Sequence, residues 1–308
     1  MRKHYTKEQI AEFRRKDKAR VKDITQKLEE GVSGLFESGK WKAFLDTMAQ
    51  FHTYTWRNTL MVMVQKPDAT RIAGAGLWRK LGRNIIKGQK ALWVLGPQLV
   101  RRKTEDDGVE RMADDPDTQG EGTYMVFRLR PVFDVSQTEG KELPDICNDL
   151  KGDAYEYQRF HDAIVAISPV PIETCRMHGT IHGWFSPKEH KIVIRNGMSE
   201  RQTLKTMIHE LTHAKLHNEE EMKVSPKDQR TMEVEAESVA YVVTKYYGLD
   251  SSDYSFGYIA GWGDGKDMKV LGKSLSTIQK TSREIIDMLN ERMGRQTHKE
   301  RRAMACAC

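Results

Sequence analysis

The sequence predicts an α+β fold in two domains. The chain has 308 residues, enough for two domains that each bury a core. Apolar residues recur at helical spacing through residues 155–167, 199–247 and 275–289. Short runs of strand character occur instead within residues 78–133 and 183–194. Helices and strands therefore occupy separate stretches of the chain, as is typical of α+β proteins.

The N-terminal half is predicted to begin with helices. Residues 1–50 interleave apolar and charged side chains at helical spacing, and residues 51–65 continue this register with more apolar residues. Pro67 and the glycines near residue 75 end the pattern.

Short strands are predicted to follow the helices of the N-terminal half. Two of them, Ala91–Leu95 and Tyr124–Phe127, flank residues 104–120. That segment holds seven acidic residues and one arginine, and we expect it to be an exposed hairpin loop.

The C-terminal half is predicted to contain a helix, a hairpin and then three further helices. The first helix covers residues 155–167 and ends at Pro169, and the hairpin pairs Gly183–Phe185 with Lys191–Ile194. Ser199, followed by Gln202 three residues later, is a capping-box signature for the next helix. A helix over about 229–247 should stop at Gly248, and a last helix should end at Gly294. The last helix has apolar spacing at Leu275, Ile278, Ser282, Ile285 and Leu289.

The helix that begins at Ser199 carries an HExxH motif, from His209 through Glu210 to His213. On a helix this spacing places two imidazoles one turn apart on one face, where both can reach one Zn²⁺ ion. Glu210 then lies beside the open position of the metal, where it can act as general base. The motif alone also occurs by chance, so a third ligand is needed to support it.

The third ligand is predicted on the following helix. Glu233 and Glu237 fall on one face of it together with two alanines, Ala236 and Ala240, that permit close approach of the two helices. Glu235 points elsewhere. We therefore expect Glu233 to be a metal ligand and Glu237 to accept a hydrogen bond from a ligating histidine. The competing interpretation is a solvated acidic face with incidental histidines.

Two further roles are left open by the sequence. Tyr254, Tyr258, His182 and His217 are candidate donors to a developing oxyanion, and no residue pattern selects among them. The hairpin before the HExxH helix either binds an extended peptide at its edge or is a plain structural hairpin.

Composition excludes several classes of protein. No apolar run reaches the roughly 18 residues of a transmembrane helix, and the N-terminus lacks the apolar core of a signal peptide. The four cysteines, at 147, 175, 306 and 308, form no CxxC pair, so free thiols in a reducing compartment are expected. Metal binding by Cys306 and Cys308 is the minor alternative. We expect a cytoplasmic protein with no membrane partner.

The charge is unevenly distributed. Residues 1–103 contain 23 lysines and arginines against 9 acidic residues, whereas the remainder of the chain is net acidic. Between residues 54 and 97 aromatic side chains alternate with cations. This combination favours single-stranded DNA, because cations follow the phosphates while aromatic rings stack on bases. Tryptophans in a core beneath a basic solvated surface are the alternative.

Four blocks of the N-terminal half resemble ArdC-type antirestriction proteins. The blocks are Phe51–Asn58, Gln65–Thr70, the stretch from Trp78 to Gly88, and Val132–Thr138. One departure is Ala91, where that family is expected to have glycine. The resemblance implies single-stranded DNA binding by this half. The residues that we expect to contact DNA are Tyr54, Trp56, Arg57, Asn58, Trp78, Arg83, Lys87 and Lys90.

Residues 150–262 resemble the zinc metallopeptidase domain of ArdC-type and ImmA/IrrE-type proteins, which is gluzincin-like. In that pattern HExxH is joined by a Glu from the next helix and by Asn, Asp or Glu four residues later, which Glu233 and Glu237 match. The resemblance implies a protein of a conjugative or mobile element that protects DNA from restriction or regulates transfer.

The predicted boundaries are a DNA-binding domain over 1–145, a metallopeptidase domain over 146–266, and a C-terminal helix and tail over 267–308. Two functions compete. One is a zinc peptidase that binds single-stranded DNA and cleaves a protein or peptide substrate that the sequence does not name. The other is antirestriction by occupancy of DNA, with a structural or vestigial zinc site.

Overall fold

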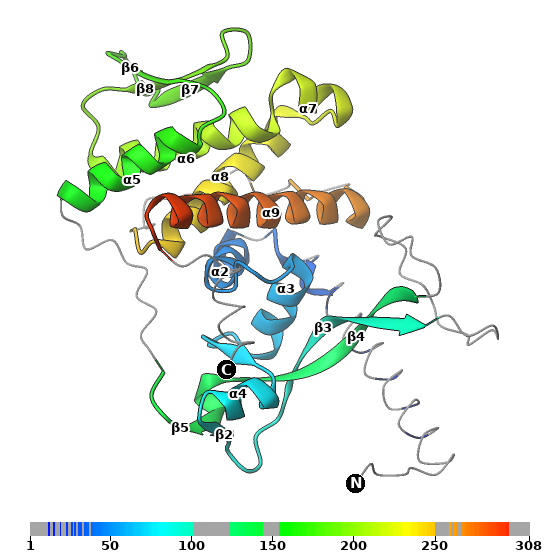
Figure 1. Cartoon of the computed structure of the whole chain (residues 1–308). Helices are drawn as coiled ribbons and strands as arrows, with labels where there is room; N and C mark the ends of the chain where they lie inside the picture. The colour runs from blue at the N-terminus through cyan, green and yellow to red at the C-terminus, as the bar shows by residue number, and fades with distance from the viewer. Residues whose placement is uncertain are drawn as a thin grey trace. The chain divides into compact units, whose positions relative to one another are not determined.

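The computed structural model describes residues 38–101, 123–143, 154–249 and 266–295, with single positions between 12 and 36 and at 259, 262 and 263. Figure 1 shows its helices and strands, which confirm the predicted α+β class. The elements are α2 (Ser38–Gln50), α3 (Trp56–Gln65), β1 (Ile72–Ala73), α4 (Ala75–Lys80), β2 (Arg83–Ile85), β3 (Leu92–Arg101), β4 (Thr123–Asp134), η1 (Val135–Gln137), β5 (Thr138–Gly140), α5 (Ala154–Ile167), β6 (Ile172–Cys175), β7 (Gly183–Ser186), β8 (Lys191–Arg195), α6 (Glu200–Leu216), α7 (Glu219–Val224), α8 (Gln229–Tyr246) and α9 (Met268–Arg292).

The chain divides into two compact units. The first comprises residues 1–29 and 61–143, and the second comprises residues 30–60 and 144–308. The division near residue 143 lies beside the expected boundary, but residues 30–60 and helix α9 group with the second unit. The reason lies in the apolar face of α2, whose Trp41 is fully buried with its ring centroid 6.0 Å from that of Trp262.

The first unit is built around an antiparallel ribbon. Strands β3 and β4 pair over ten residues, and β1 joins the other edge of β4. Both strands extend further than the sequence predicted. Asp134 at the end of β4 is fully buried, and its carboxylate accepts backbone hydrogen bonds from Thr70, Arg71 and Ser136. This one side chain therefore ties the β1 region to the turn after β4.

Two predictions for the first 80 residues are wrong in detail. Helix α3 begins at Trp56, because Thr55 accepts a hydrogen bond from the backbone of Asn58 and residues 51–55 form a turn. Residues 75–80, placed partly in strand by the sequence pattern, form helix α4. The side chain of Trp78 on α4 donates to the carbonyl of Phe133 at 2.9 Å, so a tertiary contact fixes this short helix.

The second unit layers helices on a three-stranded sheet. The strand order is β6-β8-β7, with β6 parallel and β7 antiparallel to the central strand β8. Figure 1 shows α5 and α6 beside this sheet. Helix α8 packs on α6, and α9 packs on α8. The pairing of β7 with β8 confirms the predicted hairpin. Strand β7 therefore lies at an edge of the described sheet.

The predicted helix ends of the second unit agree with the structure. Gly248 follows α8 with φ +72°, and Gly294 follows α9 with φ +60°, a region that glycine adopts without strain. The five apolar-spaced positions of α9, from Leu275 to Leu289, are all buried.

Several predicted features lie outside the described residues. These are most of the helical stretch predicted before residue 38, the acidic segment 104–120, Cys147, Tyr254, Tyr258, Cys306 and Cys308. Within the described part, Cys175 is a free thiol. None of the helices described is both long enough and apolar enough to cross a membrane.

Candidate metal centre

Helix α6 supplies the first part of the centre. The side chain of Ser199 accepts a hydrogen bond from the backbone of Gln202, which confirms the predicted N-cap. The side-chain amide of Gln202 donates to Thr206 at 3.1 Å and does not accept from the backbone N–H of Ser199, so only the Ser199 half of the capping box is formed. The cap fixes the start of α6, and His209 and His213 then follow one turn apart.

Three side chains bring their ligand atoms together. The Nε2 atoms of His209 and His213 lie 3.1 Å apart. The carboxylate of Glu233 on α8 lies 3.4 Å from Nε2 of His209 and 3.7 Å from Nε2 of His213. Among the described residues, this trio is the group whose ligand atoms all lie within 4.8 Å of one another.

The trio fits Zn²⁺. Ligand atoms about 2.0–2.2 Å from a tetrahedral zinc ion lie about 3.3–3.5 Å from each other. The distance of 3.1 Å between the two Nε2 atoms and the distances of 3.4 and 3.7 Å to the Oε2 and Oε1 atoms of Glu233 bracket this value. Two imidazoles with one carboxylate form a donor set that zinc takes at catalytic sites, where the fourth position stays open. The predicted ligand residues are thus brought together by packing of α6 on α8.

Glu237 lies behind His209, as predicted. Its Oε2 atom is 3.1 Å from Nδ1 of His209, on the side of the ring away from Glu233, and its Oε1 atom is 3.2 Å from Nζ of Lys205. Burial lowers the pKa of His209, but hydrogen bonds to Glu233 and Glu237 outweigh it and raise the pKa to about 10. Hydrogen bonds from His209 and His213 hold the pKa of Glu233 well below its usual range. In the metal-free protein, the positive charge of protonated His209 therefore balances the negative charge of the carboxylates of Glu233 and Glu237.

The side chain of Glu210 on α6 faces the edge strand β7. It is 7% exposed, and burial raises its pKa despite a hydrogen bond with the backbone of Phe185 on β7. Because the carbonyl of His182 accepts from the backbone of Arg195, Gly183 and Phe185 turn their backbone polar groups away from β8. The open edge of β7 therefore runs beside the carboxylate of the HExxH motif.

Behind His213 the structure shows a chain of contacts that the sequence interpretation did not include. Nδ1 of His213 lies 3.0 Å from Nδ1 of His217, and Nε2 of His217 lies 3.1 Å from Oε2 of Glu235. The same oxygen accepts from Nζ of Lys227 at 2.6 Å. The available signal was a third histidine four residues after HExxH, on the same helix face. Since both ring nitrogens of buried His217 are engaged, it is not free to donate to an oxyanion.

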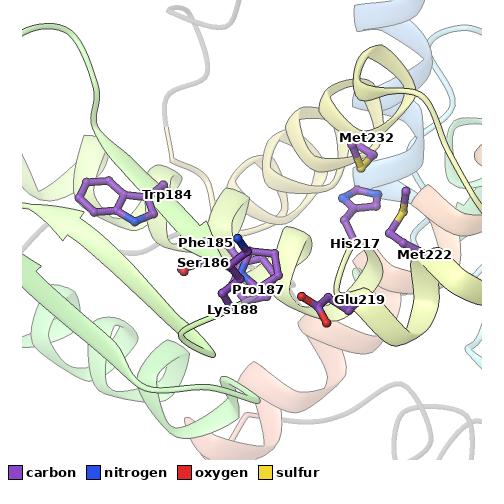
Figure 2. A pocket seen from close by; sticks show the side chains of 9 residues that line it. All are labelled: Trp184, Phe185, Ser186, Pro187, Lys188, His217, Glu219, Met222 and Met232. Carbon is purple, nitrogen blue, oxygen red and sulfur yellow. The ribbon is translucent and has the colours of Figure 1, made fainter.

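A pocket of about 480 Å³ opens between the β7–β8 turn and the helices after α6. Figure 2 shows Trp184 and Phe185 on the strand side, with His217, Met222 and Met232 on the helical side. Trp184 is exposed although it is large and apolar. The pocket is mainly apolar, and one of its residues, Met232, directly precedes Glu233 in the chain.

The predicted DNA-contacting residues divide into two groups. Trp56 and Trp78 are 6% and 2% exposed, and Asn58 is also buried. The indole of Trp56 donates to Ser276 at 3.0 Å. A buried ring has no free face for a base, so Trp56 and Trp78 pack within the protein in place of the predicted contacts, and buried Asn58 is equally inaccessible to DNA.

The remaining members of that group are more accessible. Arg83 is half-buried and donates to both the hydroxyl and the carbonyl oxygen of Thr138, so it also has a structural role. Tyr54 is half-buried, with its ring edge-on to Phe51. Exposed cations from the prediction are Arg57, Lys87 and Lys90.

Models of two known families match successive parts of the chain. A model of the N-terminal domain of anti-restriction factor ArdC matches residues 15–133, and a model of the IrrE N-terminal-like domain matches residues 165–258. The chain is similar to the uncharacterized protein pXO2-81 of Bacillus anthracis, with 27% identity over 322 residues covering 94% of this chain and 53% of the relative. The chain thus spans about half the length of that relative.

Two solved structures are also similar. The metal-free crystal structure of antirestriction protein ArdC from plasmid R388 has 18% identity and a TM-score of 0.53, covering 79% of this chain and 86% of that one. The Mn(II)-bound structure of the same ArdC protein has a TM-score of 0.49 at 18% identity, covering 78% and 85%. At this identity the metal-free match shows the fold.

Fold and site together define a two-unit α+β protein whose second unit is metallopeptidase-like. An ArdC N-terminal domain precedes an IrrE N-terminal-like domain in the chain, and the fold is that of ArdC. The chain therefore resembles ArdC-type proteins in its domains and its fold, as the four sequence blocks and the HExxH pattern predicted.

Proposed function

We propose that this chain is an antirestriction protein that binds single-stranded DNA and hydrolyses peptide bonds at a zinc centre. The observation that carries the peptidase part is the convergence of His209, His213 and Glu233 beside the buried carboxylate of Glu210. The similar ArdC protein of plasmid R388 is an antirestriction protein, which supports the biological role.

The residues of the centre have separable tasks. Zn²⁺, when held by His209, His213 and Glu233, supplies Lewis-acid polarisation of a carbonyl and lowers the pKa of a nearby water. Glu210 accepts the proton of the attacking water and passes it to the leaving amine. The backbone of Phe185 orients Glu210, and Glu237 orients His209.

Strand β7 is placed to hold the substrate. An extended peptide can pair with the outward-facing backbone groups of Gly183 and with the carbonyl of Phe185, whose N–H is held by Glu210, and this brings the peptide carbonyls past Glu210. The apolar pocket beside Phe185 then accepts a peptide side chain.

Substitution of Glu210 by Gln tests the peptidase. The variant should retain zinc, because Glu210 is not among the three ligands, and should lose cleavage of an unstructured protein such as casein. Glu220→Gln, an exposed change on α7, is the matched control and should keep both properties. Cleavage by Glu210→Gln at the rate of the unchanged protein would contradict the general-base role. If this variant loses cleavage but still protects DNA, protection arises by occupancy of DNA.

The DNA-binding part rests on charge. The N-terminal 103 residues carry the excess of 23 cations over 9 acids, and Lys87 and Lys90 are exposed. Each phosphate contact to single-stranded DNA contributes about −0.7 to the slope of log affinity against log salt. Replacing Lys87 and Lys90 by Gln should therefore make the slope shallower by about 1.4, measured by fluorescence anisotropy of a labelled oligonucleotide.

Lys223→Gln with Lys269→Gln is the control for that experiment, since it removes the same charge from exposed positions of the second unit. An affinity that is constant between about 50 and 200 mM salt would contradict the electrostatic basis of binding.

A further inference from the structure

We propose that His217 and Glu235 are positioning residues that hold His213 in the tautomer and orientation that bind zinc. This inference rests on the zinc centre of the proposed function. It concerns two residues that lie outside the HExxH motif and the Glu233 ligand position.

The contacts form one continuous line away from the centre. His213 has Nε2 on the ligand side, 3.1 Å from Nε2 of His209, and Nδ1 on the far side, 3.0 Å from Nδ1 of His217. The other nitrogen of His217 reaches Glu235 at 3.1 Å. The three residues thus connect the ligand face of α6 with a carboxylate on α8.

The order of protons along this line follows from the ligand role of His213. A histidine that binds zinc through Nε2 carries its proton on Nδ1. Nδ1 of His213 must then donate to Nδ1 of His217, which places the proton of His217 on Nε2. That proton is donated to Oε2 of Glu235. With zinc on Nε2 of His213, every donor along the line has an acceptor in this arrangement, which therefore supports the tautomer of His213 that binds zinc.

Burial protects the hydrogen bonds between His213, His217 and Glu235 from water. The side chains of His217 and Glu235 are 2% and 0% exposed, so water does not compete for their hydrogen bonds. Lys227, 2.6 Å from Oε2 of Glu235, compensates the buried charge.

The two ligating histidines are then supported in parallel ways. His209 contacts the carboxylate of Glu237 directly, whereas His213 reaches the carboxylate of Glu235 through His217. Outer partners of this kind orient ligands and raise their basicity, and their loss typically costs about 10–100-fold in metal affinity.

The experiment compares two amide substitutions of His217 by competition titration of zinc against a chromophoric chelator. His217→Asn places an amide oxygen near the position of Nδ1, where it accepts from His213. His217→Gln instead places its amide near Nε2, where it keeps Glu235 but leaves Nδ1 of His213 without an acceptor. The proposal predicts that His217→Gln loses about 10–100-fold in zinc affinity and that His217→Asn recovers most of it.

A purely structural tether between α6 and α8 predicts the reverse order, because only Gln keeps the contact with Glu235. Equal affinity of the Gln variant and the unchanged protein, or a weaker Asn variant than Gln variant, overturns the proposal. His190→Asn is the control, since His190 is exposed and has φ +48°, which Asn tolerates. Absence of zinc binding by the unchanged protein would instead refute the zinc centre itself.

Discussion

Zinc binding to this protein should displace a proton from His209. In the metal-free protein, hydrogen bonds to Glu233 and Glu237 outweigh the effect of burial and raise the pKa of His209 to about 10. His209 is therefore cationic at neutral pH, whereas a zinc ligand must be neutral at the nitrogen that binds. Each zinc ion bound below pH 10 consequently releases one proton from this residue.

The size of the effect follows from that stoichiometry. With one proton displaced, the apparent affinity for zinc rises about tenfold for each pH unit between about 7 and 9, and the dependence flattens as pH passes 10. Isothermal titration calorimetry at pH 8 in two buffers of different ionisation enthalpy counts the protons released. Chelator competition at pH 7, 8 and 9 measures the slope.

A matched substitution separates His209 from other titrating groups. Glu237→Gln removes one of the two carboxylates that raise the pKa of His209, so the slope should flatten at a lower pH than in the unchanged protein. Zinc binding at pH 8 with no proton released and an affinity that is flat from pH 7 to 9 would refute the reasoning.

Three further outcomes are expected. In the metal-free protein, the raised pKa of His209 contributes stability that is fully present below about pH 6.5 and is lost as the pH rises through about 10. Thermal melting in the presence of a chelator should show this loss of stability. A His209→Gln variant should not show it. Trp78→Ala should destabilise the first unit by about 3–5 kcal/mol in a denaturant titration, because the ring is buried, and unchanged stability with weakened DNA binding would contradict its packing role. Gly183→Ala should cost about 1–3 kcal/mol of unfolding free energy, because the added Cβ would lie 2.8 Å from the side chain of Thr206; Gly39→Ala, which meets no atom within 4 Å, is the control and should not destabilise.

Local periodicity was enough to predict which side chains of the candidate metal centre lie together. HExxH on a capped helix fixes two imidazoles on one face, and the i, i+4 pair Glu233 and Glu237 needs only a second helix packed alongside. The structure places these four side chains together, with Glu237 on the outer nitrogen of His209. Each of these relations depends on spacing within one helix or between neighbouring helices.

Relations that depend on tertiary packing were not predictable in the same way. Alternation of aromatics and cations suggested exposed rings, yet Trp56 packs against α9, more than 200 residues away in sequence. Glu235 and His217 were not predicted to interact, because helical spacing does not show that the α6 C-terminus reaches the buried side of α8. Burial of these groups is decided by which helices meet, and a single sequence does not give that.

The central claim is that His209, His213 and Glu233 bind one zinc ion. Metal analysis by inductively coupled plasma mass spectrometry of freshly purified protein, beside His213→Ala and Glu233→Gln, tests it most directly. The unchanged protein should contain about one zinc ion per chain, and both variants should contain much less. Zinc absent from the unchanged protein, or retained in full by both variants, would contradict it.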